Sequence, residues 1–183
     1  MTGASSKPAV IADLRTFSSR IDYRETVEDI LRYVPNKYLV GLDRVVIRDR
    51  GGLIRKELMR ERKRGLAAMG LYYRATRTHP AHIELFIDEI VEGWPRPLLW
   101  CKAFREVLLT QTLFHELGHH VHSHLSPEHR DRESVAKTWS SQLVRDYLRR
   151  RFWYLRPLRR PIRLLVHNLS VMIRKRRSRS RGS

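Results

Sequence analysis

Two histidines four residues apart, His115 and His119, constrain this chain more than any other feature. They lie in a stretch without proline between Pro97 and Pro127, where apolar residues recur at helical spacing. Residues i and i+4 of a helix share one face, so both imidazoles can bind the same tetrahedral Zn²⁺. We therefore expect a long helix that carries two metal ligands on one side.

Glu116 and Gly118 give this histidine pair a chemical context. Glu116 directly follows the first histidine, where its carboxylate can take a proton from a water activated by the metal. Gly118 costs a helix roughly 1 kcal/mol relative to alanine, which is explained if another segment must approach the helix closely. The pattern His-Glu-x-x-His is typical of zinc peptidases. The alternative is a buried amphipathic helix with incidental histidines.

The charge of the chain is concentrated near its C-terminus. The 183 residues, enough for one domain with tails, hold 37 Lys and Arg against 19 Asp and Glu. Residues 145–183 alone hold 14 of the basic residues and a single acid. One cysteine, Cys101, excludes an internal disulfide and fits a reducing compartment. Neither residues 1–10 nor 162–173 resemble a secretory signal or a bilayer-spanning helix, so we expect a cytoplasmic protein.

The remaining pattern predicts an α+β fold in which a small mixed sheet carries a packed hairpin of two zinc-binding helices. We expect a flexible lead-in over residues 1–19, a catalytic domain over 20–150 and a basic, aromatic-rich extension over 151–183. The expected elements are a helix over 21–33, strands over 45–47, 71–73 and 83–87, a charged, solvated segment over 53–65, and a second long helix over 127–151.

A catalytic zinc usually has three protein ligands, so a third must come from another segment. If the two long helices form an antiparallel hairpin that turns near residues 125–126, Glu133 lies about 10 Å from the turn, level with His119. Ala136, one turn later, is small enough to pack closely against Gly118. Glu133 is therefore the favoured third ligand. The competing candidates are His124, Glu128, His129 and Asp131.

The motif pair His115-Glu116-x-x-His119 and Glu133-Ser134-Val135-Ala136 resembles that of gluzincins, and residues 20–148 resemble the small minigluzincins. The resemblance implies a zincin-like fold and zinc-dependent peptidase activity. In that family the strand before the active-site helix forms the rim of the cleft and pairs with extended substrate. Latent forms, in which a terminal segment occupies the cleft, are also associated with it. The resemblance assigns substrate binding to Ile83, Glu84, Leu85, Phe86 and Ile87, a strand whose alternation also predicts one wetter face.

We predict a monomeric zinc-dependent metallopeptidase that cleaves peptide or protein substrates, with Glu116 as general base. The alternative is a non-catalytic zinc or nucleic-acid-binding module that uses the basic tail. SprT-like proteins combine the same motif with such a tail, but they use a third histidine in place of Glu133. The candidate donors to the oxyanion are His122, His124, His129 and Tyr147.

Residues 149–163 of the tail interleave arginine with large aromatic and aliphatic side chains. Three roles are open for this segment. It can dock on the domain and cover the cleft, bind an anionic membrane surface, or bind nucleic acid.

Overall fold

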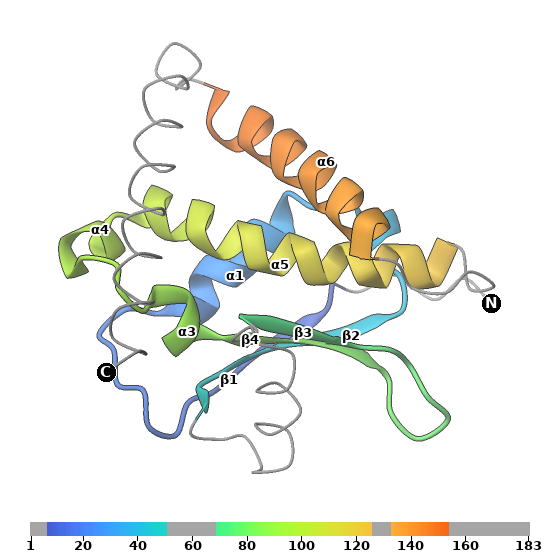
Figure 1. Cartoon of the computed structure of the whole chain (residues 1–183), viewed down its shortest axis with the longest axis horizontal. Helices are drawn as coiled ribbons and strands as arrows, with labels where there is room; N and C mark the ends of the chain where they lie inside the picture. Colours follow the sequence, from blue (N-terminus) through green and yellow to red (C-terminus); the bar gives the residue numbers. More distant parts are fainter. Residues whose placement is uncertain (1–6, 51–68, 126–132, 154–183) are drawn as a thin grey trace.

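The structure is a computed structural model of the chain, and it describes residues 7–50, 69–125 and 133–153 (Figure 1). A mixed sheet combined with helices confirms the predicted α+β class. No helix of the described part is long and apolar enough to cross a membrane. The elements in chain order are β1 (Ala9–Asp13), α1 (Tyr23–Arg32), the 3-10 helix η1 (Asn36–Tyr38), β2 (Leu42–Arg48), β3 (Gly70–Tyr73), β4 (Ala81–Phe86), α3 (Ile87–Val91), α4 (Arg96–Trp100), α5 (Lys102–Leu125) and α6 (Glu133–Arg151).

The sheet has the strand order β1-β2-β4-β3. Strands β1, β2 and β4 are parallel, and β3 is antiparallel to β4. Parallel neighbours need a crossover connection, which α1 provides between β1 and β2, whereas β3 and β4 follow each other directly in the sheet. Strand β4 is therefore paired on both sides, and β1 and β3 are the edge strands of this sheet.

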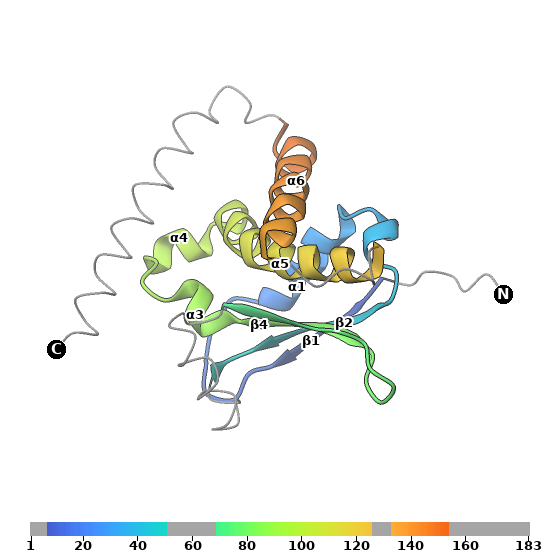
Figure 2. The same ribbon diagram turned by 45° about the vertical axis from the view of Figure 1, so that its right-hand side comes forward.

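The hydrophobic core lies between the sheet and helices α1 and α5, and α6 packs on the side of α5 that faces away from the sheet (Figures 1 and 2). Val45 and Ile47 of β2 and Ile83 and Leu85 of β4 alternate along their strands and are at most 1% exposed. This alternation directs one face of the sheet toward α5. The matching buried residues of α5, spaced four apart, are Leu109, Leu113, Leu117 and Val121.

The N-terminal part of the chain differs from the expected flexible lead-in over residues 1–19. Residues 9–13 form β1 and pair with β2 in parallel register. Only Val10 of this strand is buried, so its local sequence carries little strand signal. The strand is held by pairing with a segment more than 30 residues away, which a local pattern cannot reveal.

The carboxylate of Asp49 anchors the segment that follows β1. Asp49 is fully buried and accepts hydrogen bonds from the backbone amides of Arg15, Thr16 and Phe17 and from the Thr16 hydroxyl. Burial alone would raise the pKa of Asp49, but these donors outweigh it and hold the pKa below its ordinary value. Residues 15–17 are thereby tied to the end of β2.

The other predicted elements agree with the structure at most positions. The helix expected over 21–33 is α1, which begins after the N-cap Asp22. The strand expected over 83–87 ends at Phe86, because Ile87 begins α3. The face of β4 that was expected to be more exposed to solvent is buried. Glu84 is 5% exposed and Phe86 is 0% exposed. The charged segment over 53–65, the expected helix start at 127 and residues 154–183 of the extension lie outside the described residues.

Two contacts hold α6 against α5 as the predicted antiparallel hairpin. Gly118 lies so close to α6 that a Cβ atom built on it would be 2.5 Å from the carbonyl oxygen of Ala136. Toward the other end, fully buried Glu106 accepts hydrogen bonds from the Tyr147 hydroxyl at 2.8 Å and from the Arg151 guanidinium at 2.9 and 3.0 Å. The close approach predicted at Gly118 is confirmed.

Candidate metal centre

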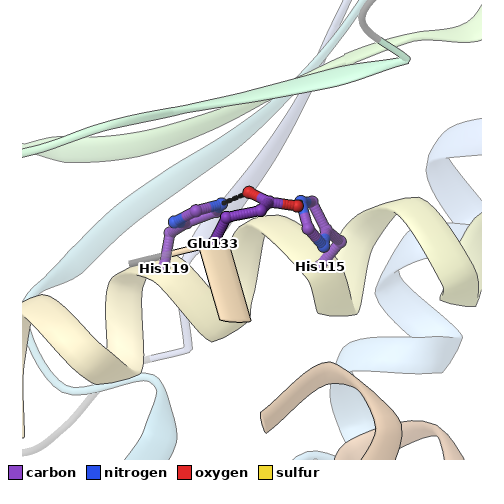
Figure 3. A group of neighbouring side chains, drawn as sticks. All are labelled: His115, His119 and Glu133. Carbon is purple, nitrogen blue, oxygen red and sulfur yellow. Dashed lines mark ion pairs between the residues drawn. The ribbon is translucent and has the colours of Figure 1, made fainter. Parts of the chain in front are cut away.

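The side chains of His115, His119 and Glu133 lie together on the α5–α6 hairpin (Figure 3). Nε2 of His115 is 3.4 Å from one carboxylate oxygen of Glu133, and Nε2 of His119 is 3.4 Å from the other. All three potential ligand atoms lie within 4.8 Å of one another. The side chains are 30%, 17% and 57% exposed, respectively, so the cluster can be reached from solvent.

These separations fit a zinc ion. Bonds of about 2.0–2.2 Å in a tetrahedral site place neighbouring ligand atoms roughly 3.4 Å apart, which is the distance between each imidazole and the carboxylate of Glu133. Two imidazole nitrogens and one carboxylate oxygen are a donor set of catalytic zinc sites, which leave a fourth position open. Closed structural sites usually use cysteine, and Cys101 is exposed at the end of α4.

The packing of the two helices determines where Glu133 lies. His115 and His119 stand one turn apart on α5, with ring centroids 5.0 Å apart. Glu133 is the first residue of α6 and precedes Ala136 by about one turn. Because Ala136 contacts the bare backbone at Gly118, α6 approaches closely enough for the Glu133 carboxylate to reach both imidazoles. A side chain at position 118 would move α6, and Glu133 with it.

Glu116 lies on a different side of α5, next to the edge strand β3. Its side chain is 7% exposed. A Cβ atom built on Gly70, the first residue of β3, would be 3.0 Å from Cγ of Glu116 and 3.3 Å from its Oε1. The same atom would be 2.8 Å from the γ-methyl group of Thr112, one turn earlier on α5. Gly70 therefore leaves the space that the Glu116 side chain fills, beside the turn that carries the two histidines.

The predicted substrate strand over 83–87 does not have a free edge. Residues 83–86 belong to β4, which is bonded to β2 on one side and to β3 on the other. Ile83, Leu85, Phe86 and Ile87 are 0% exposed, and Glu84 is 5% exposed and pairs with Arg48 at 2.9 Å. These residues cannot accept a further strand. The edge next to Glu116 belongs to β3, which the sequence predicted as a strand but not as the edge.

His120, next to the second histidine of the motif, is buried, at 3% exposed. Its Nε2 lies 3.0 Å from the carbonyl oxygen of Val40, which can only accept, so Nε2 carries the proton. Nδ1 then accepts a hydrogen bond from the Tyr72 hydroxyl of β3 at 3.3 Å. Burial lowers the pKa of His120, with the Val40 carbonyl opposing that shift. The alternating pattern of Gly70 and Tyr72 along β3, both facing α5, is the signal that could have identified this contact.

The remaining candidate oxyanion donors and metal ligands differ in burial. His122 is buried at 7% exposed, whereas His124 is exposed and stacks near His120 with ring centroids 6.1 Å apart. Tyr147 is excluded as an oxyanion donor, because it is buried between α5 and α6 and donates to Glu106. Burial first, and then Glu106, raise the pKa of Tyr147. The alternatives Glu128, His129 and Asp131 lie outside the described residues.

Three comparisons, with protein-family models, with curated proteins and with solved structures, found no match to this chain. The chemistry of the site is therefore judged from its own side chains. Two imidazoles and a carboxylate converge at one exposed point, and a second carboxylate, that of Glu116, belongs to the residue directly after His115 on the same turn of α5. The first three groups can hold a divalent metal, and the fourth can hold or move a proton.

Proposed function

We propose that this protein is a zinc-dependent metallopeptidase of the gluzincin type, with a zincin-like arrangement of sheet and active-site helix. His115, His119 and Glu133 are the metal ligands, and Glu116 is the general base. The observation that carries the proposal is the meeting of a carboxylate from α6 with the two histidines of α5, at 3.4 Å from each. The sequence motif alone supplies two of these groups, and the fold supplies the third.

The reaction we propose is hydrolysis of a peptide bond. His115, His119 and Glu133 would hold a zinc ion, which would supply Lewis-acid chemistry for the activation of water and of the scissile carbonyl. Glu116 takes the proton from the attacking water and passes it to the leaving amine. Its side chain lies against Gly70 at the start of β3, on the helix that carries the two histidines.

The substrate class is an extended peptide or protein segment that pairs with the outer edge of β3, the edge that does not face β4. Among the described strands, β3 pairs with β4 alone, so an added strand can pair along its outer edge. We therefore assign the pairing with substrate to β3, in place of the strand over 83–87 that the sequence favoured. A monomer in the cytoplasm, consistent with the single Cys101, and a latent form closed by a terminal segment remain parts of the proposal.

The test compares the zinc-loaded full chain with Glu116→Gln in an assay on a mixed peptide library read by mass spectrometry. We expect the variant to keep zinc content and thermal stability and to lose cleavage, because Glu116 moves protons and is not a ligand. Glu28→Gln, a change of a half-buried glutamate of α1 that pairs with Arg24, is the matched control and should cleave normally. Cleavage that survives in Glu116→Gln would contradict the proposal. A non-catalytic zinc module would give no cleavage in any of the three proteins.

A further inference from the structure

Helix α6 presents a polar, basic face that the hairpin does not use. Its apolar side chains, Ala136, Leu143 and Tyr147, are buried against the rest of the domain. Figures 1 and 2 show α6 as the outermost layer, with α5 between it and the sheet. The outward side chains, which together line one open hollow, are Lys137, Thr138, Ser141, Gln142, Arg145, Asp146 and Arg149. We call these seven residues the α6 outer face.

Two of the three basic side chains of the α6 outer face form no ion pair with a described residue. Arg151, two residues beyond Arg149, is bound to Glu106, and Lys137 lies 3.5 Å from the metal-site residue Glu133. Arg145 and Arg149 are exposed, and no ion pair joins either one to a carboxylate of the described residues. The single acid of the outer face is Asp146, which is half-buried. Two guanidinium groups are thus directed to solvent one turn apart.

We propose that the α6 outer face binds the phosphodiester backbone of double-stranded nucleic acid without sequence preference. Guanidinium groups match phosphate oxygens in a bidentate manner, and hydroxyl and amide side chains such as Thr138, Ser141 and Gln142 are common phosphate donors. From Lys137 to Arg149 the helix rises about 18 Å, which spans roughly five phosphates of one strand. The face therefore carries cations and neutral donors over the length of a backbone segment.

The composition of the outer face distinguishes nucleic acid from the other anionic surfaces. None of its seven residues is aromatic or aliphatic, so it has no groups to enter a lipid interface. It also offers no platform on which unpaired bases could stack, which favours a duplex over a single strand. The sequence continues this charge, because residues 154–183 hold ten Lys and Arg and no acid.

The test uses the full chain and two 20-base-pair duplexes of unrelated sequence, with affinity measured by fluorescence anisotropy from 50 to 300 mM KCl. Each phosphate contact contributes about 0.9 to the slope of log affinity against log salt. We expect Arg145→Gln/Arg149→Gln to lower the slope by about 1.8 and to weaken binding about 30-fold at 0.15 M salt, equally for both duplexes. Unchanged circular dichroism and melting temperature will show that this exposed double variant folds.

The matched control is Arg20→Gln/Arg96→Gln, which removes the same charge from exposed positions before α1 and on α4. We expect it to change the slope by much less than the α6 variant. Equal slopes for the two double variants would show a response to net charge alone and would overturn the proposal. Loss of binding to phosphatidylserine vesicles by the α6 variant, with duplex binding unchanged, would also overturn the proposal. So would tighter binding of a single strand of one sequence than of the two duplexes. None of these results depends on peptidase activity.

Discussion

Replacing Gly118 by alanine tests whether close packing of α5 and α6 is what completes the metal site. The new Cβ atom would lie 2.5 Å from the carbonyl oxygen of Ala136 and 3.2 Å from its Cα and carbonyl carbon. These are backbone atoms, which cannot rotate away as the end of a side chain can. To restore ordinary van der Waals contact, at 3.4 Å or more, α6 must recede by about 0.9 Å at this point.

The displacement has two separate costs. Overpacking of this kind destabilises a protein by about 1–3 kcal/mol, while alanine in place of glycine stabilises a helix by roughly 1 kcal/mol, so we expect a net loss of about 0–2 kcal/mol. We expect the effect on zinc affinity to be larger than the effect on the free energy of unfolding. A shift near 0.9 Å carries Glu133 well outside the tolerance of about 0.2 Å for a metal–ligand distance. We expect zinc affinity to fall about 10- to 100-fold, as it does when groups that orient metal ligands are changed.

The assay is zinc affinity by competition with a chromophoric chelator, together with urea unfolding of the metal-free protein. Gln111→Ala, at an exposed position of the same helix, is the matched control and should leave zinc affinity unchanged. If Gly118→Ala binds zinc as the wild type does and is more stable by about 1 kcal/mol, helix propensity is the only effect. The reasoning that couples the Gly118–Ala136 contact to the metal site would then be refuted.

Two further predictions concern other parts of the structure. Gly70→Ala places a methyl group 3.0 Å from Cγ of Glu116, so we expect kcat to fall while zinc content and unfolding free energy change little; wild-type kcat would contradict the role of Gly70. The lowered pKa of Asp49 means that its ionised form stabilises the fold above pH 3.8 and that this stabilisation is lost as pH falls through the folded-state pKa. Asp49→Asn should therefore cost about 2 kcal/mol at pH 7, measured by urea unfolding, with a smaller difference at pH 3; an equal difference at both pH values would contradict this.

Much of the candidate site could be predicted because it depends on local geometry. The spacing of His115 and His119 determines their shared face on any helix. Glu133 was reached by counting residues from the hairpin turn, which works because helical rise is constant and the two helices are antiparallel. Gly118 on α5 and Ala136 on α6 are both small, and each predicted that the two helices approach closely at this point. The burial of Leu113 and Leu117 follows equally from helical periodicity.

The order of the strands could not be predicted, because strand pairing is not encoded locally. Both Gly70–Tyr73 and Ala81–Phe86 read as strands, but nothing in either sequence says which lies at the edge. That order decides which strand lies at the edge of the described sheet beside Glu116, and the prediction chose the central strand instead. The prediction that residues 9–13 belong to a flexible lead-in was wrong for the same reason. The contact of His120 with Tyr72 joins residues 48 positions apart, and it exists only because β3 lies along α5.

Zinc content of the purified full chain, measured by elemental analysis for the wild type, Glu133→Ala and His129→Ala, tests the central claim most directly. The three-residue metal site predicts one zinc per wild-type chain, the same for His129→Ala, and a marked loss for Glu133→Ala. Full zinc content in Glu133→Ala, with loss in His129→Ala, would contradict the assignment of Glu133 as the third ligand.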